Sequence, residues 1–123
     1  MNVVDSSGWL EFFAGSERAA LFEPAILEVD ALIVPTLSLY EVYQVVLRQR
    51  SETEALQAVT FMRQGEIVDL DGPLALSAAE LSVRHRLPMA DSILLATARS
   101  RDATLWTQDR DFAGLDGVRY FEK

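Results

Sequence analysis

The sequence contains no cysteine and only one histidine among its 123 residues. The lack of cysteine excludes thiol nucleophiles, zinc-thiolate sites and disulfide scaffolds, and it fits a reducing compartment. The one histidine, His85, stands between Arg84 and Arg86. A Ser-His-Asp triad would therefore have one available base and no clear partner for it. The sequence therefore excludes cysteine-based catalysis and disfavours catalysis by a Ser-His-Asp triad.

Long apolar runs are also missing. No stretch approaches the roughly 18 apolar residues that suggest a membrane-spanning helix. The first five residues carry no basic group ahead of an apolar run, so they do not resemble a secretory signal. Half of the residues are hydrophobic and no Gly/Ser/Pro-rich tract interrupts them. We expect a cytoplasmic protein without a membrane partner, folded as a single domain over residues 1–123.

Positive charge is scarce in this chain. It has 11 Lys and Arg residues against 19 Asp and Glu residues, which gives a formal net charge of −8. Proteins that bind nucleic acids usually present a basic surface, so this balance argues against a phosphate-rich partner. The argument loses force if the acids hold divalent cations, because a bound metal then supplies the positive charge. Whether the negative charge excludes a nucleic-acid partner therefore depends on where the acids lie.

Hydrophobic patterning predicts strands that alternate with helices. We expect strands at 2–4, 32–34, 67–70, 104–107 and 118–121. We expect helices near 7–15, 16–29 with Ser16 as its cap, 38–47, 56–65, 73–86 and 88–98, and a turn or short helix at 109–115. This alternation predicts an α/β protein with a parallel sheet covered on both faces and right-handed crossovers.

Four acids are placed where such a sheet binds ligands. Ligands bind beyond the carboxyl ends of parallel strands, where the strand order reverses. That rule selects Asp5, which follows the first expected strand, and Asp109, which follows the fourth. Glu41 and Asp91 stand near the starts of helices that follow strands or connections. We expect the four carboxylates to converge on one edge of the sheet.

Three of these acids also have a purely local explanation. Asp5 is suited to cap the helix that begins near Ser7, since Asp is common in that role. Glu41 lies three residues after Ser38, which is the spacing of a capping box. Asp109 is suited to a surface turn, where its side chain would bond nearby backbone. Taken singly, none of the three residues requires a functional site.

Asp91 is harder to explain locally. Leu94, Leu95 and Ala98 follow it at helical spacing, which places its carboxylate over the apolar stripe of the helix. A helix-dipole contact in the first turn contributes only about 0.3 to 1 kcal/mol at exposed sites. That is less than the desolvation cost of an unpaired carboxylate. A metal ion would offset this cost, so Asp91 is the strongest candidate for a ligand.

Four blocks of sequence stand out together. In chain order the blocks are Val3-Val4-Asp5-Ser6-Ser7, then Ile33-Val34-Pro35-Thr36 with Tyr40-Glu41-Val42, then Pro88-Met89-Ala90-Asp91-Ser92-Ile93-Leu94-Leu95-Ala96, and Leu105-Trp106-Thr107-Gln108-Asp109-Arg110-Asp111-Phe112. They resemble one known family, the VapC-type toxins with a PIN domain. Each block alone is a loose pattern. Their order and separations within a chain of this length make the resemblance specific, and it covers essentially the entire chain.

The resemblance implies a three-layer α/β/α sandwich around a central parallel sheet. It also implies a metal-dependent endoribonuclease that forms a homodimer, acts on RNA and is inhibited by a VapB-like antitoxin. Matched position by position, the acidic site of the family falls on Asp5, Glu41, Asp91 and Asp109, with Thr107 beside the last acid. Asp111 is the alternative for the fourth position.

Residue chemistry favours magnesium as the metal, with manganese as a substitute. A carboxylate cluster without histidine or cysteine offers hard oxygen ligands, which do not suit zinc or copper. The residue types are compatible with a site for one metal ion or for two. Arg99, Arg101 and Arg110 are suited to hold an RNA backbone, but they are equally suited to be solvated surface charges, and we assign them no role.

Three rival functions fit the sequence less well. A receiver domain carries paired acids after its first strand and a late lysine, whereas the only lysine here is Lys123. A haloacid-type phosphatase places a second Asp two residues after the first, and Ser7 occupies that position. A PIN fold kept only as a binding module is disfavoured because all four acids are present.

Overall fold

A single parallel sheet organises the chain. The computed structural model describes residues 1–123, and its five strands lie in the order β3-β2-β1-β4-β5. Every neighbouring pair of strands is parallel, which confirms the predicted sheet. The strands are β1 (Asn2–Val4), β2 (Leu32–Pro35), β3 (Glu66–Val68), β4 (Thr104–Thr107) and β5 (Val118–Tyr120).

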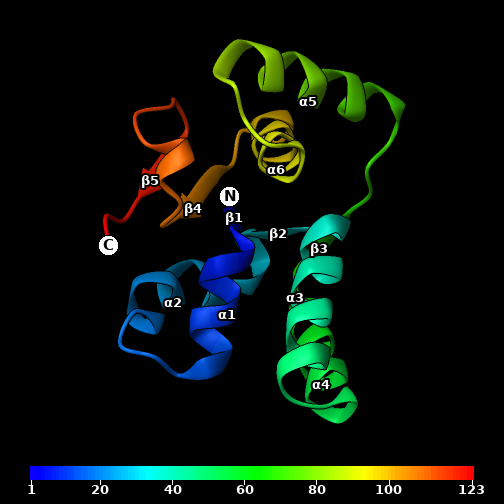
Figure 1. The fold of residues 1–123 in the computed structure, drawn as a ribbon, viewed down its shortest axis with the longest axis vertical. Coiled ribbons are helices and arrows are strands. Elements are labelled where there is room, and N and C mark those ends of the chain that lie inside the picture. The colour runs from blue at the N-terminus through cyan, green and yellow to red at the C-terminus, as the bar shows by residue number, and fades with distance from the viewer.

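Helices cover both faces of this sheet. Helices α5 and α6 lie on one side, and α1 to α4 lie on the other (Figure 1). The helices are α1 (Ser6–Ala14), α2 (Ala19–Leu27), α3 (Thr36–Gln49), α4 (Glu52–Met62), α5 (Gly72–His85) and α6 (Met89–Ser100), with short 3-10 helices η1 (Val29–Ala31) and η2 (Arg110–Phe112). The predicted three-layer α/β/α sandwich is therefore confirmed.

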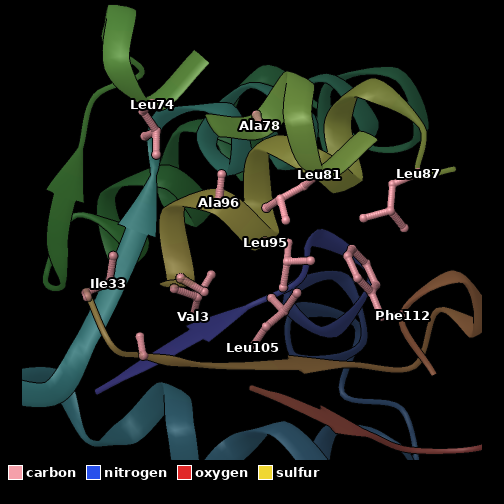
Figure 2. Close-up of a cluster of buried hydrophobic side chains, with 12 residues drawn as sticks. Val3, Ile33, Leu74, Ala78, Leu81, Leu87, Leu95, Ala96, Leu105 and Phe112 are labelled. Carbon is pink, nitrogen blue, oxygen red and sulfur yellow. The ribbon is translucent and has the colours of Figure 1, made fainter. Parts of the chain in front are cut away.

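The two faces of the sheet have separate hydrophobic cores. Successive strand residues point to opposite faces, so Val3 packs under α5 and α6 while Val4 packs against α1 and α2. Figure 2 shows the first core, in which Leu81 of α5 and Leu95 of α6 lie above Val3 and Leu105. Both cores anchor β1 and β4, so the ends of these two strands are held firmly.

Several predicted boundaries were wrong. Helix α4 covers Glu52–Met62, whereas a helix near 56–65 was expected, because Ser51 caps the helix ahead of its apolar residues. Helix α3 begins at Thr36, directly after Pro35, so Ser38 lies inside the helix and does not start it. Helix α2 begins at Ala19, and Ser16 donates its hydroxyl to the Glu11 carboxylate at 2.9 Å instead of capping that helix. Strand β3 covers residues 66–68, because the chain leaves its partner β2 where that strand ends at Pro35.

The strand order reverses between β1 and β4. The chain adds β2 and then β3 on one side of β1, and it later crosses to the other side for β4 and β5. Val4 is aligned with Trp106, and the Asp5 amide donates to the Trp106 carbonyl at 2.9 Å. The residues that follow β1 and β4 therefore lie side by side, at the position where parallel sheets bind ligands.

Candidate active site

A pocket opens at this switch point. Its volume is about 490 Å³, and its lining consists of Asp5, Ser6, Ser7, Glu41, Asp91, Gln108, Asp109, Arg110, Tyr120, Glu122 and Lys123. The four predicted acids all line it, although they come from the end of β1, from α3, from α6 and from the loop after β4. The sheet and the starts of two helices thus bring together residues up to about a hundred positions apart.

Asp5 faces strand β4 from the end of β1. Its side chain is almost fully buried, and its Oδ2 accepts a hydrogen bond from Thr107 Oγ1 at 2.8 Å and one from Ser7 Oγ at 3.4 Å. Asp5 occupies the N-cap position of α1, but its side chain makes no capping hydrogen bond. The local capping explanation for Asp5 is therefore wrong.

Glu41 is held by the first residue of α1. Its Oε1 accepts a hydrogen bond from the hydroxyl of the buried Ser6 at 2.6 Å. The capping-box explanation was wrong as well, because Ser38 is buried within α3 and its hydroxyl has no hydrogen-bond partner. Ser6 was not assigned a role from the sequence, and its position next to Asp5 was the signal that could have found it.

Asp109 serves a local turn and also faces the pocket. Its Oδ1 accepts from the Asp111 amide at 2.9 Å and so caps η2, which confirms the predicted turn contact. Its own amide donates to Thr107 Oγ1 at 2.9 Å. The Thr107 hydroxyl therefore connects Asp109 to Asp5.

Both candidates for the fourth acid lie close to Asp91. Carboxylate oxygens of Asp91, Asp109 and Asp111 all lie within 4.8 Å of one another. Asp109 is half-buried and lines the pocket, whereas Asp111 is exposed and does not belong to the pocket lining. The short η2 helix brings both acids toward α6. Asp109 and Asp111 therefore lie together with Asp91 in one cluster of three acids.

None of the acids in the pocket forms an ion pair with a basic side chain. The three ion pairs of the protein use Glu11, Glu54 and Glu66, and none uses an acid of the pocket. Burial, and after it the charges of Asp109 and Asp5, raise the pKa of Asp91 to about 7. Burial likewise raises the pKa of Asp5 to about 6, against the lowering effect of the Thr107 hydrogen bond.

This donor set fits a hard divalent cation. Carboxylate oxygens are the ligands that magnesium, manganese and calcium prefer. The acids also repel one another, which adds to the effect of burial in raising the pKa values of Asp5 and Asp91, and a bound cation would relieve that repulsion. Asp91, Asp109 and Asp111 would hold the ion most directly, with Asp5 and Glu41 in the same pocket.

Few basic residues reach the pocket. Arg110 and Lys123 line it. Arg99 donates to the Asp116 carbonyl at 3.0 Å, and Arg101 pairs with Glu66 at the opposite edge of the sheet. No sequence pattern pointed to Lys123, because only the course of the chain after β5 brings this residue to the acids.

A comparison with protein families identifies the fold. The family model of the PIN domain matches residues 3–118, so the chain belongs to the PIN-domain family. A nuclease role is general for this family, and its nucleases use divalent metal ions. A comparison with curated proteins found no significant match. No helix has the length and apolar character required to cross a membrane.

Several solved structures of similar shape are described as toxins or toxin-antitoxin complexes. A toxin-antitoxin complex from Klebsiella pneumoniae has a TM-score of 0.81 at 22% identity, over 97% of this chain and 96% of the other. VapC20 of Mycobacterium tuberculosis, described as a sarcin-ricin loop cleaving toxin, has a TM-score of 0.78 at 18% identity, over 94% and 95%. DNA-bound VapBC of Salmonella typhimurium has a TM-score of 0.73 at 19% identity, over 98% and 96%.

Proposed function

We propose that this protein is a magnesium-dependent endoribonuclease and the toxin of a VapBC-like toxin-antitoxin pair. The observation that carries the proposal is the cluster of acids without basic partners at the switch point of a PIN-domain sheet. The fold of this protein is similar to that of a toxin described as cleaving the sarcin-ricin loop, which supports RNA as the substrate class. We further propose that residues 1–123 act as one PIN domain.

Asp5, Glu41, Asp91 and Asp109 are the proposed metal-binding and catalytic residues. When bound, magnesium or manganese supplies a Lewis acid for phosphoryl oxygens and lowers the pKa of water for attack on phosphorus. The chain supplies fixed carboxylates for this purpose. Thr107 holds Asp5 and Asp109, and Ser6 holds Glu41. Asp111 extends the acidic cluster at the solvent side.

The proposed partners are RNA, a VapB-like antitoxin and a second copy of this chain. Solved structures with this fold include a toxin-antitoxin complex and a VapBC assembly on DNA. Because the pocket is acidic, the antitoxin is expected to insert an arginine or lysine that competes with the cation. Changing that basic residue to alanine should weaken the complex. An interface that leaves the pocket open and the enzyme active would contradict this mode of inhibition.

Cleavage of RNA with and without magnesium tests the activity. Purified protein should cut a structured RNA with magnesium or manganese and lose this activity in EDTA. Asp91→Asn should lose about a hundredfold or more, the scale seen when a group that stabilises a transition state is removed. Asp69→Asn, an exposed acid outside the pocket, is the matched control and should remain active. Equal activity in EDTA would show that the mechanism is wrong.

A further inference from the structure

Arg18 connects three separate segments near the acidic pocket. It directly precedes α2, and its Nε donates to Gln108 Oε1. Its Nη2 donates to the carbonyl oxygens of Phe121 at 3.2 Å and Glu122 at 3.4 Å. One guanidinium group thus holds both the loop after β4 and the segment after β5. Arg18 does not itself line the pocket.

The Gln108 side chain is fixed at both of its polar ends. Its Oε1 accepts from Arg18, and its Nε2 donates to Glu11 Oε2 at 3.0 Å. Gln108 is only 5% exposed, and both of these hydrogen bonds are partly buried. It stands between Thr107 and Asp109 in the chain. Fixing Gln108 therefore restricts where the Asp109 backbone lies relative to Asp91.

The segment after β5 supplies a basic group to the same pocket. The Phe121 amide donates to the Thr107 carbonyl at 2.9 Å, which continues the pairing of β5 with β4. Glu122 and Lys123 then line the pocket. Because Arg18 binds the carbonyls of Phe121 and Glu122, it fixes the course of the chain that carries the only lysine to the acids.

We infer that Arg18 is a positioning residue of the proposed nuclease site. By holding Gln108 and the carbonyls of residues 121 and 122, it keeps Asp109 beside Asp91 and keeps Lys123 at the rim, where an RNA phosphate would bind. The inference rests on the proposed function for its consequence in catalysis. The positioning itself is a property of the folded chain.

The role of Arg18 is testable, because loss of its positioning and loss of its charge should change cation affinity in opposite directions. Loss of the positive charge in Arg18→Met, taken alone, would strengthen cation binding at an acidic pocket. Loss of the hydrogen bonds would instead loosen Asp109 and so weaken cation binding. Arg18→Lys keeps the charge but lacks the planar group that bonds several acceptors at once. Arg101→Met is the matched control, since it removes an ion pair at the opposite edge of the sheet.

Two measurements on the intact protein distinguish positioning by Arg18 from an effect of its charge. Calorimetric titration with manganese should give a dissociation constant about tenfold or more higher in Arg18→Met and also raised in Arg18→Lys, because a hydrogen bond to a charged group contributes at least enough for that factor. Hydrogen exchange should be faster by a similar factor at the amides of Asp109, Asp111 and Phe121. Arg101→Met should change neither quantity.

The exchange experiment separates this inference from the proposed function. If the unchanged protein binds no manganese and cuts no RNA, the proposed function fails, and the exchange rates still report whether Arg18 holds the two segments. Exchange at Asp109, Asp111 and Phe121 that is the same in Arg18→Met as in Arg101→Met would overturn the inference. So would manganese binding that becomes tighter in Arg18→Met and stays unchanged in Arg18→Lys, since that pattern is the one expected of charge alone.

Discussion

Thr107 makes two hydrogen bonds that link the acids at the ends of β1 and β4. Its hydroxyl donates to Asp5 and accepts from the Asp109 amide, and its side chain is fully buried. A resemblance pointed to this residue, but the sequence could not reveal that one hydroxyl serves both acids. Asp91 is the opposite case, because helical spacing over an apolar stripe was sufficient to single it out.

Thr107→Val should impair the site while nearly keeping its shape. The valine leaves the Asp109 amide without its partner and leaves Asp5 Oδ2 with only the longer hydrogen bond from Ser7. Each group left unsatisfied should cost about 1 to 3 kcal/mol of unfolding free energy. Cation affinity and RNA cleavage should both fall, and Thr107→Ser should retain both. Denaturant unfolding and cation titration measure these effects. Cation affinity equal to the unchanged protein in Thr107→Val would contradict the proposed role of the hydroxyl.

At the scale of whole elements, the order of strands and helices was predictable and several of their ends were not. Alternating patterns predicted the five strands, and the switch-point rule predicted that Asp5 and Asp109 lie near each other, as they do in the pocket. Helix starts were less certain, because two signals competed at α3. Ser38 with Glu41 has the spacing of a capping box, but the helix begins directly after Pro35. Glu41 is thereby released from a local role and is held by Ser6 across the pocket.

The two serines Ser38 and Ser51 provide a matched test of where these helices begin. Ser51 caps α4 by accepting from the Glu54 amide at 3.1 Å, so Ser51→Ala should cost about 0.5 to 2 kcal/mol. Ser38 is buried inside α3 without a hydrogen-bond partner, so Ser38→Ala should leave the protein as stable or more stable. Urea unfolding of both variants measures the difference. A larger loss in Ser38→Ala would place the start of α3 at the position first predicted.

For the molecule as a whole, pH should change stability through the acidic pocket. Asp5 and Asp91 have pKa values near 6 and 7 in the folded protein, against an ordinary value of 3.8. Between about pH 4 and pH 7 the folded state therefore holds protons that the unfolded chain has released, and stability falls as pH rises through this window. Melting temperatures in EDTA should be lower at pH 8 than at pH 5. Asp91→Asn should reduce that difference, and a full difference in this variant would contradict the assignment.

Magnesium should reverse this loss of stability, which tests the site without any knowledge of the substrate. Because a cation at the pocket binds the folded state, it should stabilise the protein by about 2.7 kcal/mol at a hundredfold excess over its dissociation constant. Asp91→Asn and Asp5→Asn each remove a repelling charge while nearly keeping shape. We therefore expect the metal-free variants to be as stable as the unchanged protein or more stable, with a smaller magnesium effect.

Two exposed acids outside the pocket, Asp69 and Asp116, are the controls for this experiment. Asp69→Asn and Asp116→Asn remove the same charge and should keep the full magnesium effect, because a loss of net negative charge alone does not empty the site. Thermal melts in EDTA and in millimolar magnesium compare all four variants. Burial and, after it, the charges of the neighbouring acids raise the pKa of Asp91, so the magnesium effect must depend on this residue if the ion binds there. An undiminished effect in Asp91→Asn would mean that the cation binds elsewhere on the protein.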